Sequence, residues 1–494
     1  TKMFNKCVKE GYFPNELKIA KVIPLFKNKG SINDICNYRP ISMLSIFSKI
    51  FEKLLHRTIL DFFDSNQLFN NAQFGFRPKH STAHALINAV SHLQESLDEN
   101  KYALGIFIDF SKAFDTINHK ILLDRLDSYG IKGNLHNVFT SYLNDRYQYV
   151  CYGDNTSSLL KLTCGVPQGS VLGPLLFIIF INDITNASSL AKYILFADDL
   201  NIFLENLDRN SLYEEANQVL KCIFQYCRAN LLIVNFDKCC FIDFSRSANS
   251  PNLSIGIGIK EFKRVEVCKF LGVYIRSDLK WVDHMNHVIN QVSKSCGSMY
   301  SIKAHVPSKV LRQVYLSLVQ PYITYCLPLW GQNFSSAVLN RLFVLQKKCI
   351  RIICNSTSKI NGSFQHTKPM FFKLKLLTIF NLFNYFCGCF GMSILKYRLP
   401  KELLKLFIVS NRSNRLVVPK FKKSRIRNDN FIYNAYRILN YLSDNDISYV
   451  NLSPEIFKKR LKQHLLNMQF ISINGDANWL PCNNYLFSDV VIGY

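Results

Sequence analysis

Two adjacent acidic residues, Asp198 and Asp199, are the clearest candidates for chemistry in this chain. They stand between two short, apolar and β-prone segments, residues 191–195 and 200–204. This pattern predicts a strand, a tight turn and a returning strand, since Asp tolerates the backbone angles of such turns. A hairpin tip that carries two carboxylates could hold a divalent cation such as magnesium. Because an Asp-Asp pair also arises by chance in a chain of this length, the pair taken alone favours a solvated turn.

A third carboxylate follows an apolar segment further upstream. Residues 104–109 predict a buried strand, and Asp109 stands at its end. Asp109 could cap the helix-like segment that follows, or it could meet Asp198 across an antiparallel sheet. Three carboxylates gathered in this way would repel one another unless cations held them. Two metal ions that clamp the attacking and leaving oxygens of a phosphoryl transfer would meet that need.

Between the two acidic sites lies an irregular segment, residues 164–174, with two prolines and three glycines. Such a composition forces an irregular backbone and allows close approach of other groups at each glycine. An ordinary loop would fit these residues. A loop and helix start that line a nucleotide site explain the combination better.

The bulk composition is that of a folded protein with an anionic partner. The chain has 494 residues, 48% of them hydrophobic and 19% charged, which predicts a globular protein of two to four domains. Its net charge of +25 favours nucleic acid or an anionic membrane as partner, with a merely soluble basic protein as the alternative.

The sixteen cysteines do not form a recognisable disulfide or zinc pattern. We expect them to pack as small buried side chains in a reducing compartment. The first residues show no apolar signal segment, which also argues against a disulfide framework. Because the sequence begins abruptly with Thr1 and without an initiating Met, we expect a piece of a longer polypeptide. Residues 376–395 are apolar, but their polar residues favour a buried helix over a membrane span.

Hydrophobic periodicity divides the chain into an α+β part and a helical part. Up to about residue 275, short strands alternate with amphipathic helices, which fits an antiparallel sheet. One long helix is predicted over residues 46–63, with Ile46, Ile50, Leu54 and Ile59 near one face. Other predicted elements are strands at 104–109 and 147–152, and helices at 120–129, 174–182, 212–226, 283–303, 309–319 and 337–353. The domain change is placed at residues 276–282.

Two basic clusters lie in the helical part. Residues 412–427 could contact phosphates or form a plain solvated loop. Their basic members are Arg412, Arg415, Lys420, Lys422, Lys423, Arg425 and Arg427. The second cluster is Lys458, Lys459, Arg460 and Lys462 on a predicted C-terminal helix.

Taken together and in order, these motifs resemble a reverse transcriptase of the non-LTR retrotransposon type, similar to the jockey and chicken-repeat elements. The resemblance covers about residues 13–275. It includes Asn-Tyr-Arg-Pro-Ile-Ser at 37–42, Gln-Phe-Gly-Phe-Arg at 73–77, the Asp109 motif at 107–115, Gly-Val-Pro-Gln-Gly-Ser at 165–170 and Phe-Ala-Asp-Asp at 196–199. Asn235 with Lys238, then Lys-Phe-Leu-Gly-Val at 269–273, resemble the motifs that close the palm. One such motif could arise by chance, but a collinear set could hardly do so.

The resemblance implies a role for each acidic position. Asp109, Asp198 and Asp199 would bind two Mg²⁺ ions, with Mn²⁺ as the alternative. One ion would activate the primer 3′-hydroxyl and the other would neutralise the leaving group. Lys238 would protonate the pyrophosphate.

The resemblance also implies a set of residues that bind nucleotide and primer. Lys27 and Arg39 on the fingers would contact the phosphates of the incoming nucleotide. Phe114 would crowd the ribose 2′ position, and Phe110 and Gln168 would complete the nucleotide site. The primer end would be gripped by Phe270, Leu271 and Gly272.

The implied fold is a right-hand polymerase of the α+β class, with fingers and palm at 1–276, a helical thumb at 283–355 and a basic helical region at 356–494. The implied activity is RNA-directed DNA polymerisation. Its partners would be an RNA template, a DNA primer or nicked target DNA, and deoxynucleoside triphosphates, without a membrane. The expected location is the cytoplasm and nucleus. A catalytically silent nucleic-acid-binding remnant and a group II intron maturase-like protein stay open as alternatives.

Overall fold

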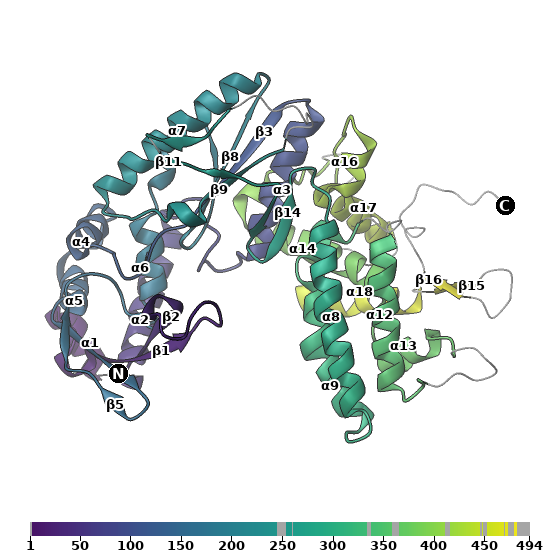
Figure 1. Cartoon of the computed structure of the whole chain (residues 1–494), viewed down its shortest axis with the longest axis horizontal. Helices are drawn as coiled ribbons and strands as arrows, with labels where there is room; N and C mark the ends of the chain where they lie inside the picture. Colours follow the sequence, from purple (N-terminus) through teal and green to yellow (C-terminus); the bar gives the residue numbers. More distant parts are fainter. Residues whose placement is uncertain are drawn as a thin grey trace. The chain divides into compact units, whose positions relative to one another are not determined.

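The computed structural model describes residues 2–244, 253–258, 260–332, 337–357, 365–410, 415–444, 447, 452–468, 470–472 and 479–481. These residues form two compact units (Figure 1). Unit 1 comprises Thr1–Pro78, Leu104–Phe241 and Asn249–Arg264, and unit 2 comprises Lys79–Ala103, Ile242–Ala248 and Val265–Tyr494. Each unit is described on its own, and the domain boundaries inferred from the sequence stay predictions.

Unit 1 combines helices with two larger sheets. Its helices are α1 (Lys2–Glu10), α2 (Ile46–Ser65), α4 (His119–Ser128), α5 (Gly133–Leu143), α6 (Gly173–Phe180) and α7 (Arg209–Ala229). One sheet contains β1 (Ile19–Phe26), β2 (Tyr38–Met43), β4 (Arg146–Tyr152), β5 (Asn155–Thr156) and β6 (Leu160–Leu162). The other has the order β12 (Lys263–Arg264), β9 (Cys240–Asp243), β3 (Tyr102–Ile108), β8 (Asp199–Asn206) and β7 (Lys192–Phe196). A small hairpin pairs β10 (Gly256–Ile257) with β11 (Lys260–Glu261). The predicted α+β class is confirmed.

Local signals in the sequence set the helix boundaries of unit 1. The Asn118 side chain accepts a hydrogen bond from the Ile121 amide and so caps the start of α4. Gly130 follows α4 with φ +94°, the left-handed backbone with which glycine commonly ends a helix. Asp208 caps α7 through the Ser211 amide. The predicted helices at 120–129 and 212–226 therefore begin and end close to where caps and glycine place them.

The predicted apolar face of α2 is wrong at three of its four residues, although the helix itself is confirmed. Ile46, Ile50 and Leu54 are exposed, whereas Ile59 is buried, together with Phe51 and Leu55. The helix carries apolar residues on both sides, so spacing alone did not identify the inner one. Glu52 lies on the buried face, beside Phe51, and has no exposed surface.

Unit 2 is mainly helical. Its helices are α3 (Thr82–Asp98), α8 (Val282–Ile302), α9 (Ser308–Val314), α10 (Gln320–Thr324), α11 (Leu327–Trp330), α12 (Ala337–Ile353), α13 (Lys368–Leu374), α14 (Ile379–Tyr397), α15 (Lys401–Leu404), α16 (Ser424–Asp429), α17 (Phe431–Asp444) and α18 (Pro454–Asn467). Two hairpins accompany them, β13 (Val267–Phe270) with β14 (Val273–Arg276), and β15 (Phe470–Ser472) with β16 (Trp479–Pro481). Figure 1 shows α8 and α12 running side by side, where they pack together.

The apolar segment 376–395 corresponds to α14. Most of its side chains are buried, including Asn381 and Asn384. The Asn381 amide donates to the Leu465 carbonyl at 3.2 Å, and the Asn384 amide donates to the Asn381 side chain at 3.3 Å. Within the described ranges no single helix has the length and apolar composition to cross a bilayer. Helices α13 and α14 have that length and composition only when taken together, and the pair is bent by 42°.

The two basic clusters differ in their anchoring within unit 2. The Asp98 carboxylate accepts hydrogen bonds from the backbone amides of Lys422 and Lys423, each at 2.8 Å. This segment is therefore attached to the end of α3, and Arg412 lies outside the described residues. Lys458, Lys459, Arg460 and Lys462 are exposed on α18. Most of the described cysteines are buried or half-buried, as expected, whereas Cys36 and Cys164 are exposed.

Candidate active site

The acidic turn is the tip of a two-stranded hairpin, as predicted. Strands β7 and β8 pair antiparallel up to Phe196 and Asp199, which leaves Ala197 and Asp198 as the turn. Ala197 has a left-handed backbone with φ +55°, an uncommon conformation for a residue with a side chain. Asp198 thus stands in the turn and Asp199 opens β8.

Residues 72–75 hold this turn in place. The Gln73 side-chain oxygen accepts hydrogen bonds from the amides of Gly75 at 2.8 Å and Ala197 at 3.1 Å. A Cβ atom on Gly75 would lie 2.3 Å from the Ala197 nitrogen, so only glycine allows this approach. Backbone hydrogen bonds between Phe74 and Leu195 (2.8 Å) and between Leu195 and Ala72 (2.8 Å) complete the attachment. The motif at 73–77 therefore supports the strained turn that carries Asp198.

Asp109 follows β3, which lies next to β8 in the sheet. Its carbonyl oxygen accepts a hydrogen bond from the Asn235 amide at 2.8 Å, so the segment after β3 is paired with the segment that leads to Lys238. The Lys238 ammonium lies 2.9 Å from Asp109 Oδ2. The sequence did not predict this ion pair, which places Lys238 directly at the acidic site.

The three carboxylates influence one another electrostatically. Burial raises the pKa of Asp198, and the charge of Asp109 raises it further. Protein atoms packed around the carboxylate, together with the charges of Asp198 and Asp109, raise the pKa of Asp199 to about 6, although the residue as a whole is exposed. The nearby ammonium of Lys238 opposes both shifts. The site therefore has an excess of negative charge that Lys238 offsets only in part.

This donor set fits a divalent cation in its chemistry. All three side chains offer carboxylate oxygens, the ligands that magnesium prefers, and their mutual repulsion would be relieved by a cation. Across the part of the chain that the structure describes, no group of three His, Cys, Asp or Glu side chains is already gathered around one point. A cation would therefore have to draw the carboxylates together and compete with Lys238 for Asp109.

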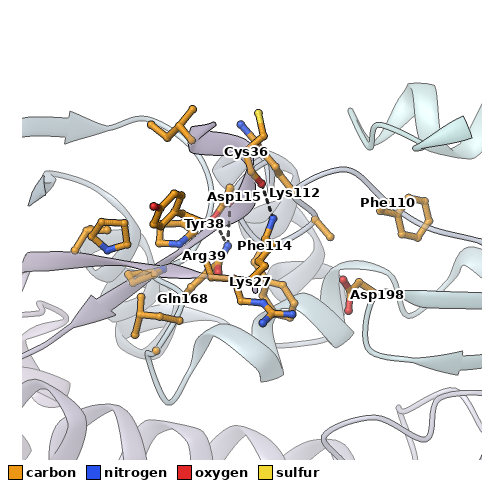
Figure 2. A pocket seen from close by; sticks show the side chains of 18 of the residues that line it. Lys27, Cys36, Tyr38, Arg39, Phe110, Lys112, Phe114, Asp115, Gln168 and Asp198 are labelled. Carbon is orange, nitrogen blue, oxygen red and sulfur yellow. Dashed lines mark hydrogen bonds between the residues drawn. The ribbon is translucent and has the colours of Figure 1, made fainter. Parts of the chain in front are cut away.

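Asp109 and Asp198 line a pocket of about 770 Å³ in unit 1. Figure 2 shows Asp198 toward one end of this pocket, with Lys27, Arg39, Phe114 and Gln168 toward the other. The lining combines basic, acidic and aromatic side chains from the segments that the sequence singled out. Lys238 also lines the pocket, whereas Asp199 is absent from its lining.

Gln168 is fixed by Asp115. Its side-chain nitrogen donates to both carboxylate oxygens of Asp115, at 2.9 and 3.0 Å (Figure 2). The backbone carbonyl oxygen of Gln168 accepts a hydrogen bond from the backbone amide of Ser42 at 2.7 Å. Burial raises the pKa of Asp115, and the bond from Gln168 works against that rise. An ionised carboxylate can accept hydrogen bonds but cannot donate them. Asp115 in that form therefore favours the orientation in which the side-chain nitrogen of Gln168, and not its side-chain oxygen, faces it.

The remaining predicted nucleotide residues take different positions. The Lys27 ammonium donates to the Cys36 carbonyl at 2.8 Å, and Arg39 is exposed on β2. The Phe114 ring packs on Phe177 with their centroids 4.7 Å apart. Phe110 is buried, and its backbone bridges to Val234. All four line the pocket, while their roles toward a nucleotide stay predictions.

The predicted primer grip belongs to unit 2. Phe270 ends β13, and Leu271 and Gly272 form the turn before β14, with φ +44° and +84°. The Tyr325 hydroxyl donates to the Leu271 carbonyl at 2.6 Å. The three residues thus form a defined hairpin turn, and their role toward a primer stays a prediction.

Three residues with clear structural roles were not singled out from the sequence. Asp115 and Gln73 stand inside motifs that were quoted, but their hydrogen-bond partners are distant in sequence. Glu52 gave only a weak signal, an acidic residue four positions after Ser48 on a predicted helix. The structure shows that Glu52 is buried and accepts a hydrogen bond from the Ser48 hydroxyl at 3.0 Å.

Residues 27–275 match the protein family described as "Reverse transcriptase (RNA-dependent DNA polymerase)". The match covers half of the chain and includes the residues that line the pocket except Val22 and Pro24, which precede it. The chain belongs to this family.

Curated relatives identify the branch of the family. The chain is 28% identical over 375 residues to the "Probable RNA-directed DNA polymerase from transposon BS" of Drosophila melanogaster, covering 74% of this chain and 41% of that protein. It is 27% identical over 364 residues to the "RNA-directed DNA polymerase from mobile element jockey" of the same species, covering 71% and 39%. The resemblance to non-LTR retrotransposon enzymes is thereby confirmed. The chain spans about two fifths of the length of these relatives.

Solved structures of telomerase also resemble the chain. Apo telomerase from Candida tropicalis aligns with a TM-score of 0.43 and 12% identity, covering 79% of this chain and 68% of that one.

Proposed function

We propose that this chain is the RNA-directed DNA polymerase part of a non-LTR retrotransposon protein. The observation that carries the proposal is that Asp109 and Asp198 line one pocket together with Lys27, Arg39 and Gln168. Carboxylates that repel one another favour cations, and basic side chains favour phosphates. A nucleoside triphosphate with magnesium combines both kinds of charge. The names of the curated relatives support the same activity.

The proposed site divides its work between two ends of the pocket. Asp109, Asp198 and Asp199 would hold two Mg²⁺ ions, with Mn²⁺ as the alternative. When bound, these ions supply activation of the primer 3′-hydroxyl and neutralisation of the leaving group. Lys27 and Arg39 attract and orient the triphosphate by charge and hydrogen bonding.

The other pocket residues shape the substrate and handle the proton. Gln168, held by Asp115, contacts the incoming nucleotide, and Phe114, supported by Phe177, restricts the space beside the sugar. The Lys238 ammonium donates a proton to the leaving pyrophosphate. To do so Lys238 must first release the Asp109 carboxylate, which it contacts at 2.9 Å.

The template and primer are proposed from charge. A net charge of +25 favours a polyanionic partner, and the exposed cluster of Lys458, Lys459, Arg460 and Lys462 offers phosphate contacts. We infer an RNA template and a DNA primer or nicked target DNA, by likeness to the relatives. Binding of a primed template should weaken steeply as the salt concentration rises.

Primer extension on an RNA template tests the proposed activity. The wild-type chain should add deoxynucleotides in the presence of Mg²⁺ and stop when the ion is chelated. Salt-sensitive binding of RNA without any incorporation would instead support a catalytically silent, nucleic-acid-binding remnant. Selective, tight binding of one structured intron RNA would favour a maturase-like protein.

A further inference from the structure

The buried carboxylate of Glu52 is attached to the loop at residues 164–174. Glu52 lies on α2 in unit 1, and its side chain has no exposed surface. Its Oε2 atom accepts hydrogen bonds from the backbone amides of Val171 at 2.7 Å and Leu172 at 3.2 Å. Its Oε1 atom accepts one from the Ser48 hydroxyl. The carboxylate therefore joins α2 to the backbone just before α6.

Burial of this carboxylate is costly, so the surroundings must compensate for it. Burial raises the pKa of Glu52, and its three hydrogen bonds oppose the rise. The Arg146 guanidinium opposes it too, by its charge. Arg146 is itself fully buried, and its Nη1 atom donates to the Tyr142 carbonyl at 3.1 Å. The protein therefore keeps an ionisable side chain in its interior, away from the pocket lining, where hydrogen bonds and a guanidinium offset the cost of its burial.

The backbone that Glu52 holds leads directly to the pocket wall. The Ser170 hydroxyl donates to the Pro167 carbonyl at 2.8 Å and accepts from the Gly173 amide at 3.0 Å. Ser170 is thus tied to both ends of a tight turn. Pro167, Gln168 and Gly169 line the pocket, whereas Glu52 does not. Glu52 therefore contacts the backbone of this loop without lining the pocket itself.

We propose that Glu52 is a positioning residue for the incoming nucleotide, acting through the Val171 and Leu172 amides on the loop that presents Gln168. Asp115 sets the orientation of the Gln168 amide, and Glu52 sets the position of its backbone. Without Glu52, the half-buried Val171 amide and the buried Leu172 amide lose their acceptor, and the loop gains freedom that nucleotide binding must then remove. The inference rests on the proposed function, since it assigns the effect to nucleotide binding.

Single-nucleotide incorporation with varied deoxynucleotide concentration tests the assignment. Glu52→Met keeps the volume of the side chain but removes the acceptor, and should raise KM about tenfold while kcat changes less than about threefold. Glu52→Gln should return KM to within about threefold of wild type, because its amide oxygen can accept from both backbone amides while its nitrogen donates to Ser48. Asp61→Asn, an exposed position on the same helix, is the matched control and should match wild type.

Two kinetic outcomes would overturn the proposal. One is a Glu52→Met variant with lowered kcat and thermal stability but an unchanged KM, which is the mark of a purely structural role. The other is a Glu52→Gln variant as impaired as Glu52→Met. If Glu52→Met does not fold, Ser48→Ala removes one partner of the carboxylate and should raise KM about twofold to threefold. An unchanged KM in that variant would count against the proposal.

Hydrogen exchange of the full chain separates this inference from the proposed function. In Glu52→Met, amides in residues 166–173 should exchange at least about tenfold faster than in wild type, and in Glu52→Gln at nearly the wild-type rate. Equal exchange in all three proteins would overturn the link between Glu52 and the loop. This readout needs no polymerase activity, so an inactive wild type would contradict the proposed function while leaving the exchange result to be judged by itself.

Discussion

The acidic turn and the pocket wall reach stability in opposite ways. The wall at residues 164–174 donates hydrogen bonds to the carboxylates of Asp115 and Glu52 and accepts one from the Ser42 amide. The acidic turn is attached through its backbone to residues 72–75, while its carboxylates repel one another. The polar groups of the wall find hydrogen-bond partners within the folded chain. The carboxylates of the acidic turn keep an excess of negative charge that a cation would offset. If the proposed function holds, the pocket wall has its shape before a nucleotide binds, whereas the acidic turn needs a cation to relieve the repulsion between its carboxylates.

Removing Asp109 should have the largest effect on this contrast. Asp109→Asn keeps the shape of the side chain but removes a charged ligand and the partner of Lys238. We expect nucleotide incorporation to fall about 1000-fold or more, equivalent to about 4 kcal/mol in the barrier. Asp154→Asn, at an exposed position, serves as control. A variant within tenfold of wild type would show that the acidic end is not the reacting end.

Gly75→Ala tests whether the backbone of the acidic turn is fixed as firmly as the wall. The added Cβ would press on the Ala197 nitrogen, so we expect a loss of about 1–3 kcal/mol in the free energy of unfolding. Incorporation should fall with it, because Asp198 is displaced. Denaturant unfolding and primer extension measure both effects. Unchanged unfolding would mean that residues 72–75 do not constrain the turn.

Asp115→Ala tests whether the pocket wall depends on the hydrogen bonds that hold the Gln168 side chain. Without its acceptor, the Gln168 amide loses its fixed orientation. We expect KM for the deoxynucleotide to rise about fivefold to tenfold, with a smaller change in kcat, because both hydrogen bonds from Gln168 to the half-buried Asp115 carboxyl group are lost. A fall in kcat alone would place Asp115 with the acidic end instead.

Asp199 gives the smallest effect, and one that depends on pH. Its pKa rises from 3.8 to about 6 on folding, so the folded protein holds this proton more tightly and stability falls as the pH rises through that window. Above about pH 6 the ionised carboxylate opposes folding. Asp199→Asn should therefore stabilise the metal-free protein at pH 8 by about 0.5 kcal/mol, a small value because the residue is exposed, and by less at pH 5. Thermal unfolding at both pH values, with Mg²⁺ expected to reduce the difference, measures this. A larger gain at pH 5 would contradict the assignment.

The sequence predicted the elements of the site better than their contacts. The hairpin at Asp198, the strand before Asp109 and the helix after Pro174 follow from local patterns and are confirmed. The pairing of Lys238 with Asp109 and of Gln73 with Ala197 depends on how distant segments meet, which periodicity does not encode. On α2 the two-sided apolar pattern concealed the inner face, and with it the buried position of Glu52.

We expect Asp198 to belong to the reacting centre of a polymerase. Single-turnover addition of one deoxynucleotide to a DNA primer on an RNA template, with Mg²⁺, tests it most directly. Asp198→Asn should bind the primed template as wild type does and yet incorporate about 1000-fold more slowly. Incorporation by Asp198→Asn at the wild-type rate would contradict the account.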